Sequence, residues 1–204
     1  MRSTAPAIRA LLAGAALSLA PISHADTTAS FHLGGGTLTQ NQANAIGWAF
    51  TPTDWIAVSS LGIWDSDGAG LAKQHEVGIF RASDNALMVS AIIVDGTQLP
   101  LVDGSRFTPV APVTLTPGVG YYILGDDFTA DPFASGPGSM GFGPQINWTA
   151  MATGSGNSIH ATPTLTPGSL GNLGPNFQYT IPAPAVGGLI GVSLLGMAAR
   201  RRGR

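Results

Sequence analysis

Residues 75–93 read HEVGIFRASDNALMVSAII, and this stretch decides the fold class. Its second half places apolar side chains at every second position, namely Leu87, Val89, Ala91 and Ile93. This is the period at which a β-strand buries one face. Asp84 and Asn85 separate this run from the apolar run 75–81, and both residue types favour tight turns. We therefore predict two antiparallel strands joined as a hairpin, with the alternating face of the second strand buried.

The same pattern continues outward on both sides of this hairpin. Further short apolar runs lie at 46–50, 58–63, 113–115, 119–125, 146–150 and 177–181. Ser59 and Ser60 break the second run and predict an irregularity there, and Thr116-Pro117-Gly118 predicts a turn. Residues 126–144 are rich in Gly, Pro and Asp, which predicts a long exposed loop. Short strands separated by turns predict an all-β fold, specifically an antiparallel β-sandwich of the jelly-roll or immunoglobulin-like type over residues 26–181.

Composition agrees with one such domain and limits what it can bind. The chain has 204 residues with 28 Gly, 15 Pro, no Cys and only 10% charged residues, so disulfides and thiolate metal sites are excluded. Residues 26–181 contain three basic residues against eleven acidic ones, a net charge of −8. Such a body repels phosphate backbones, so we expect no nucleic-acid partner.

The N-terminus has the features of a secretory signal peptide over residues 1–25. Arg2 and Arg9 supply the positive region, ALLAGAALSLA at 10–20 supplies an apolar helix, and Ser23-His24-Ala25 supplies small residues before a cleavage site. We expect signal peptidase to cut between Ala25 and Asp26.

The C-terminus, residues 182–204, combines three features in order. Pro182-Ala183-Pro184 precedes the apolar run 185–199, and an arginine cluster follows it: Arg200, Arg201, Arg202 and Arg204. As a helix the fifteen apolar residues would extend roughly 22 Å at 1.5 Å per residue, short of the roughly 30 Å hydrocarbon core, so arginine snorkelling would be needed to span it. The arginines favour a cytoplasmic C-terminus. The signal peptide directs the following chain outward, so both ends predict the same topology, with the body outside.

This tail resembles the PEP-CTERM sorting signal of Gram-negative bacteria, in a variant with Ala183 where glutamate is usual. The resemblance implies export through the inner membrane, transient anchoring there by the hydrophobic helix, and an exosortase-like membrane enzyme as a processing partner. It also implies an exported protein of the cell surface or extracellular space, associated with exopolysaccharide and biofilm.

A second resemblance covers roughly residues 45–130. The segments WAFT at 48–51, LGIWD at 61–65, HEVGIF at 75–80 and PVTLTPG at 112–118 resemble a β-sandwich domain of unknown function of the DUF4082 type. This resemblance implies a fold and no activity.

One acidic segment invites comparison with a calcium loop. Asp65, Asp67 and Glu76 fall at positions 1, 3 and 12 of an EF-hand-like loop. However, position 5 is Ala69, position 9 is Lys73, and the flanks are predicted strands. We therefore expect a polar hairpin loop without metal, and keep the three acidic residues only as weak candidates.

Other catalytic constellations are sparse. No Gly-x-Ser-x-Gly elbow is present, and His32, His75 and His160 lack the spacing of metal ligands. The acidic group Asp126, Asp127 and Asp131 would suit glycoside cleavage only if two carboxylates met in a cleft. Five aromatic residues would stack on sugar rings if exposed, although most are expected in the core: Trp55, Trp64, Tyr121, Tyr122 and Trp148.

The sequence thus favours an exported structural protein of the surface or matrix, without catalysis and without a cofactor. A carbohydrate-binding module is the alternative, and a secreted hydrolase is a weaker one.

Overall fold

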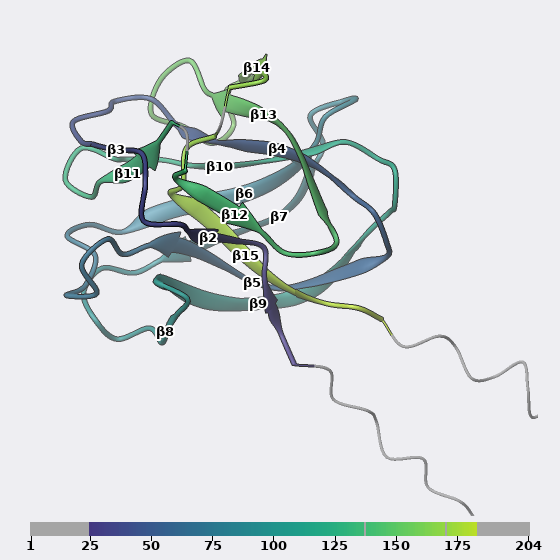
Figure 1. Cartoon of the computed structure of the whole chain (residues 1–204), viewed down its shortest axis with the longest axis horizontal. Helices are drawn as coiled ribbons and strands as arrows, with labels where there is room; N and C mark the ends of the chain where they lie inside the picture. The colour runs from purple at the N-terminus through teal and green to yellow at the C-terminus, as the bar shows by residue number, and fades with distance from the viewer. Residues whose placement is uncertain (1–24, 137, 170, 183–204) are drawn as a thin grey trace, which may run out of the picture.

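The computed structural model describes residues 25–136, 138–169 and 171–182, which form an antiparallel all-β structure of several sheets. Figure 1 shows the strands gathered in one body, with the two described ends of the chain leaving it close together. The prediction of an all-β antiparallel fold is confirmed. The predicted helices at residues 1–25 and 182–204 lie almost wholly outside the described residues.

Two large sheets contain most of the strands. The five-stranded sheet has the order β1 (Thr27–Thr28), β15 (Pro175–Thr180), β5 (Ile56–Trp64), β9 (Ser105–Leu115), β8 (Leu101–Val102). The six-stranded sheet has the order β14 (Thr164–Pro167), β13 (Ile146–Thr153), β4 (Ile46–Pro52), β10 (Tyr121–Gly125), β6 (His75–Arg81), β7 (Leu87–Ile93). Two small sheets pair β3 (Thr37–Thr39) with β11 (Phe133–Ser135) and β2 (Ser30–His32) with β12 (Met140–Phe142).

Both large sheets contribute side chains to one apolar core. Trp48 and Phe50 of β4 pack against Phe177 of β15, with ring centroids 5.8 and 5.1 Å away, and the Trp48 indole N–H donates to the carbonyl oxygen of Pro175. Full burial of each such side chain contributes about 1.5–3 kcal/mol. A second buried cluster covers the other face of the six-stranded sheet, where Phe80 and Tyr122 stack beside Ile159.

The predicted hairpin is present, but its buried face is shorter than expected. β6 pairs with β7 across the turn at Asn85, which has a positive φ of 56°. Val89 and Ala91 are half-buried and Ile93 is buried, whereas Leu87 is exposed, so that part of the prediction is wrong. The pairing skips Met88, which shifts the register by one residue. A one-residue shift moves a side chain to the opposite face of the strand.

Other local predictions have mixed outcomes. The irregularity at Ser59 is confirmed, because the pairing of β5 with β9 passes from Val58 to Ser60. The turn Thr116-Pro117-Gly118 is present and joins strands of different sheets, β9 and β10. The last strand ends at Thr180, so Ile181 lies outside it, exposed.

The predicted exposed loop at 126–144 is wrong. This segment forms β11 and β12, and Phe128, Phe133 and Met140 in it are buried in the core. Its glycines and aspartates shape tight turns, while the apolar residues between them point inward. The segment therefore packs on the core, and its strands pair with the N-terminal strands β2 and β3.

Within the described residues, no helix is long and apolar enough to cross a membrane.

Candidate functional site

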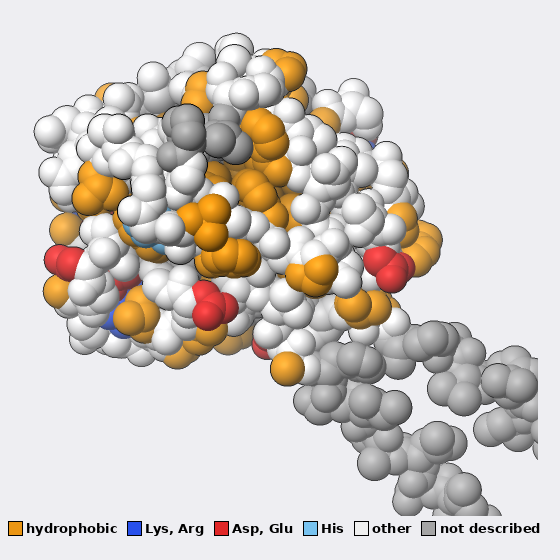
Figure 2. Space-filling model, viewed as in Figure 1, with side chains coloured by type: hydrophobic (Ala, Val, Ile, Leu, Met, Phe, Trp, Pro, Cys, Tyr) orange, Lys and Arg blue, Asp and Glu red, His pale blue; other side chains and the backbone are white. Residues whose placement is uncertain are grey.

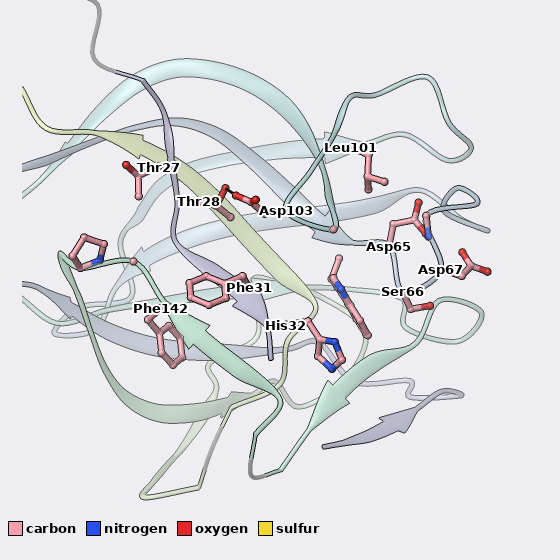
Figure 3. Close-up of a pocket in the computed structure, with 15 residues that line it drawn as sticks. Thr27, Thr28, Phe31, His32, Asp65, Ser66, Asp67, Leu101, Asp103 and Phe142 are labelled. Carbon is pink, nitrogen blue, oxygen red and sulfur yellow. Dashed lines mark hydrogen bonds between the residues drawn. The ribbon is translucent and has the colours of Figure 1, made fainter. Parts of the chain in front are cut away.

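The described residues form a groove of about 940 Å³. It lies where the N-terminal strands β1 and β2, the turn after β12, the loop after β5 and the β8–β9 turn meet, as Figure 3 shows. The residues that line it include Thr27, Thr28, Phe31, His32, Trp64, Asp65, Ser66, Asp67, Leu101, Asp103 and Phe142. Its volume is in the upper part of the range of about 300–1,000 Å³ usual for ligand pockets.

Phe31 forms an aromatic platform in this groove. In the pairing of β2 with β12 its partner is Gly141, which has no side chain. A Cβ atom on Gly141 would lie 2.4 Å from the Phe31 ring, so the ring lies directly over the glycine backbone. The side chain is nevertheless 38% exposed. Figure 2 shows hydrophobic side chains gathered in the hollowed middle of the face where these strands lie. Phe31 therefore packs on one side and leaves apolar surface open to a ligand.

Trp64 and His32 form a second aromatic group. Trp64 ends β5 and is only 5% exposed, and its ring centroid lies 4.8 Å from that of His32. His32 Nε2 lies 3.0 Å from the carbonyl oxygen of Gly35, which fixes the imidazole. Gly104 leaves room beside the indole, since a Cβ atom there would lie 3.4 Å from Trp64 Nε1. Among the described residues, no hydrogen bond is found for this indole N–H, and the atom is not enclosed, so water can reach it. It is an unused donor on the groove lining.

Acidic and hydroxyl groups complete the lining. Thr28 donates its hydroxyl hydrogen to Asp103 Oδ2 at 2.7 Å, which ties the first strand to the β8–β9 turn. That turn consists of Asp103 and Gly104, both with positive φ. Asp67 is exposed and accepts one hydrogen bond, from the backbone N–H of Ala69. No Lys or Arg lines this groove among the described residues. Its exposed carboxylates therefore make it negative.

Asp65, the first candidate calcium ligand, is occupied by protein groups. Its carboxylate accepts hydrogen bonds from the backbone N–H groups of Gly68 and Gly70 and from Arg106 Nε at 2.7 Å. Asp65 and Arg106 are both buried. The guanidinium also donates to carbonyl oxygens of Gly68, Thr97 and Leu99. The positive charge that neutralises the Asp65 carboxylate is therefore the Arg106 guanidinium.

The other two candidates lie apart from this pair. Asp67 is exposed in the loop, whereas Glu76 lies in β6, where its carboxylate is 3.7 Å from His160 Nε2. In the part of the chain that the structure describes, no group of three His, Cys, Asp or Glu side chains is arranged to hold a metal ion. The structure therefore does not bring Asp65, Asp67 and Glu76 together.

A buried histidine organises the acidic segment 126–131 instead. His75 Nδ1 lies 2.6 Å from the carbonyl oxygen of Asp126, and its Nε2 lies 3.1 Å from Asp131 Oδ2. Asp131 also accepts hydrogen bonds from the backbone N–H groups of Ala72 and Lys73. Burial raises the pKa of Asp131, but these hydrogen bonds outweigh burial, so its pKa lies below the usual value. The expectation that this segment is an exposed loop is wrong here too, because His75 and Asp131 are buried.

The two neighbouring carboxylates, Asp126 and Asp127, have different partners. Asp126 accepts a hydrogen bond from the backbone N–H of Glu76, and burial raises its pKa. Asp127 accepts hydrogen bonds from Thr129 and Lys73, which lower its pKa. None of the acidic residues 126, 127 and 131 lines the groove.

Of the five aromatic residues considered for sugar stacking, the structure places only Trp64 in the groove. Tyr121 and Tyr122 are buried, Trp148 is half-buried, and Trp55 is 51% exposed but lies outside the groove lining. The sequence reasoning missed Phe31, Phe142 and Asp103. The Asp103-Gly104 pair is a strong two-residue hairpin signal and could have located that turn. Nothing local could have located Phe31, which becomes a platform only opposite Gly141.

The residues predicted to be processed lie at or beyond the two described ends. Ala25 and Asp26 are exposed, and so is Pro182, while Ala183, Pro184 and Arg200, Arg201 and Arg202 lie outside the described residues. No model of a known protein family matches the chain, and no curated protein is similar to it.

Proposed function

We propose that this chain is an exported structural protein of the cell surface or extracellular matrix. In this proposal signal peptidase removes residues 1–25, and an exosortase-like membrane enzyme processes the tail 182–204 after transient anchoring in the inner membrane. The exported body is associated with exopolysaccharide and biofilm, and it has no catalytic activity and no cofactor. We also infer that the two large sheets form a β-sandwich of the jelly-roll or immunoglobulin-like type.

One observation carries the proposal: both ends of the body leave it side by side. β1 pairs antiparallel with β15, so Thr27 lies opposite Tyr179. Asp26 is held at this position by a hydrogen bond of 2.7 Å from the Ser59 hydroxyl. The signal peptide and the sorting tail would therefore leave the folded body at the same end. Both signals act at one membrane, and this arrangement supports a body that is presented from that membrane by one end.

Intact-mass measurement of the protein released from cells tests the route. We expect a species that begins at Asp26 and lacks residues 182–204. A variant with Arg200, Arg201 and Arg202 replaced by serine should not be released, because the positive cluster that fixes the tail is lost. A matched change in the body, Arg81→Ser, should leave release unchanged, since Arg81 pairs only with Asp84 at the surface. Released protein that still carries the arginine tail would contradict the proposal.

A carbohydrate-binding module remains the second candidate, and the groove favours it. Its lining combines an exposed aromatic ring, an unused indole N–H and carboxylates, which are the groups that contact sugar faces and hydroxyls. A hydrolase is supported less, because Asp65, the buried carboxylate of the groove, is paired with Arg106.

A further inference from the structure

We propose that the groove binds a segment of uncharged polysaccharide, with a sugar ring stacked on Phe31 and hydroxyls bound by Trp64, Asp67 and Asp103. This inference rests on the carbohydrate-binding function proposed above and is independent of the sorting route. It adds the residues of the site and the charge class of the ligand.

The unused donor at Trp64 points to a ligand with oxygen acceptors. Trp64 lines the groove and is only 5% exposed. No hydrogen bond is found for its indole N–H among the described residues. Water can reach this N–H, so a ligand oxygen would replace a water molecule there, and the indole would orient the ligand rather than supply most of the binding energy. Leu101 and Phe142 add apolar surface elsewhere on the groove lining.

Phe31 gives the ligand its second property, an apolar face. Its ring is backed by Gly141 and cannot turn inward, because the space below it is filled by backbone. Pyranose rings present C–H groups on one face and hydroxyls around the edge. A flat aromatic platform beside hydroxyl-binding groups fits this combination.

The charge of the lining selects against acidic sugars. Asp65 is neutralised by Arg106, but Asp67 and Asp103 are exposed, and no Lys or Arg stands beside them in the groove lining. Each has one carboxylate oxygen that makes no hydrogen bond within the described residues, because Ala69 occupies only Asp67 Oδ1 and Thr28 only Asp103 Oδ2. Free carboxylate oxygens accept hydrogen bonds from hydroxyls and repel uronates and phosphates.

The groove lining is also spread over several elements. Figure 3 shows its labelled side chains spread from Thr27 and Phe142 on one side to Asp67 on the other, with Phe31 and His32 between them. Together with the volume of about 940 Å³, this shape suits several linked sugars better than one ring. A polymer chain is therefore the ligand we infer.

Affinity electrophoresis of the full chain, purified in mild detergent, tests the site. The gels contain a soluble β-glucan, a galactomannan or polygalacturonate at equal mass. We expect at least one neutral polymer to retard the protein and polygalacturonate not to. Phe31→Ala should weaken that binding by about tenfold, a change of 1.4 kcal/mol. Trp55→Ala is the matched control, since it removes an exposed aromatic ring outside the groove lining, and it should leave binding unchanged.

A second variant makes the charge claim testable without disturbing the platform. Asp67→Asn keeps the shape and one acceptor oxygen, so it should weaken neutral binding only a few-fold and reduce the exclusion of polygalacturonate. Near-ultraviolet circular dichroism confirms that each variant is folded. The proposal is overturned if no neutral polymer binds, if polygalacturonate binds equally well, or if Phe31→Ala and Trp55→Ala behave alike. None of these outcomes alters the mass of the released protein, so this site can fail while the sorting route stands.

Discussion

The core between the two large sheets and the polar loop region, residues 65–76 and 126–131, are held together by different forces. In the core, long strand ladders satisfy the backbone, and apolar packing supplies the stability. In the polar loop region, carboxylates replace the ladder as acceptors for backbone N–H groups, which belong to Gly68, Gly70, Ala72, Lys73 and Glu76. The difference teaches that this chain uses its few charges to build loops. Core variants should therefore be insensitive to pH, and loop variants sensitive to it.

The largest effect is expected from Trp48→Ala in the core. The side chain is fully buried, contacts Phe50, Phe142 and Phe177, and loses its hydrogen bond to Pro175. We expect a loss of about 3–5 kcal/mol in the free energy of unfolding, measured by urea titration and unchanged between pH 5 and 8. Trp55→Ala, in the same titration, should change stability by no more than about 0.5 kcal/mol. Equal losses in the two variants would mean that the core is not where stability resides.

The next effect is expected from Arg106→Met in the polar loop region. The change leaves the Asp65 carboxylate buried without its guanidinium partner, which generally costs about 3–5 kcal/mol. We expect the lower end, about 3 kcal/mol, because Gly68 and Gly70 still donate to the carboxylate. The double variant Asp65→Ala/Arg106→Met should be more stable than the single one by chemical denaturation. If Arg106→Met were as stable as the parent protein, the Asp65–Arg106 ion pair would not stabilise the polar loop region.

A smaller, pH-dependent effect is expected from Asp131→Asn. The pKa of Asp131 is lowered in the folded chain, so its ionised form stabilises the fold at neutral pH. That contribution is lost as the pH falls from about 4, the ordinary value, through the lower folded pKa. We expect the variant to be less stable by about 2 kcal/mol at pH 7, with the gap closing in acid. Thermal unfolding from pH 7 to pH 3 measures both.

Asp126→Asn is the matched control for this prediction. Burial raises the pKa of Asp126, so its ionised form disfavours the fold at neutral pH, the opposite sign to Asp131. Asparagine keeps an oxygen that can accept the N–H of Glu76. The control should be as stable as the parent protein, or slightly more stable, at pH 7. If both variants lost stability equally, the pKa difference between the two carboxylates would not be the cause.

The sequence predicted the core better than the polar loop region, for a physical reason. Alternation and turn residues act over a few positions, so the strands at β4, β5 and β6, the turn at Asn85 and the irregularity at Ser59 could all be found locally. Residues 126–144 were wrongly predicted to form an exposed loop, because their Gly, Pro and Asp content is typical of loops. Phe128 and Phe133 in this segment are buried by residues that are distant in the sequence.

The groove could not be predicted because distant segments build it. Thr28 and Asp103 are 75 positions apart, and they meet only after β1 joins β15 and β8 joins β9. The part of the groove that a local signal did mark, Asp103-Gly104, is a turn. This turn lines the groove only because the fold places it beside Trp64 at the end of β5.

The place of β15 in the five-stranded sheet has a consequence for the timing of folding. β15 lies between β1 and β5, yet its residues, 175–180, are made after every other described strand. Among the described strands, only the pairs β6–β7, β8–β9 and β13–β14 join neighbours in the chain. Distant pairings form slowly because long loops must close first. The five-stranded sheet therefore stays incomplete until nearly the whole body has been made, and the export proposed above would benefit from this delay, because an unfinished fold can still be threaded through a membrane.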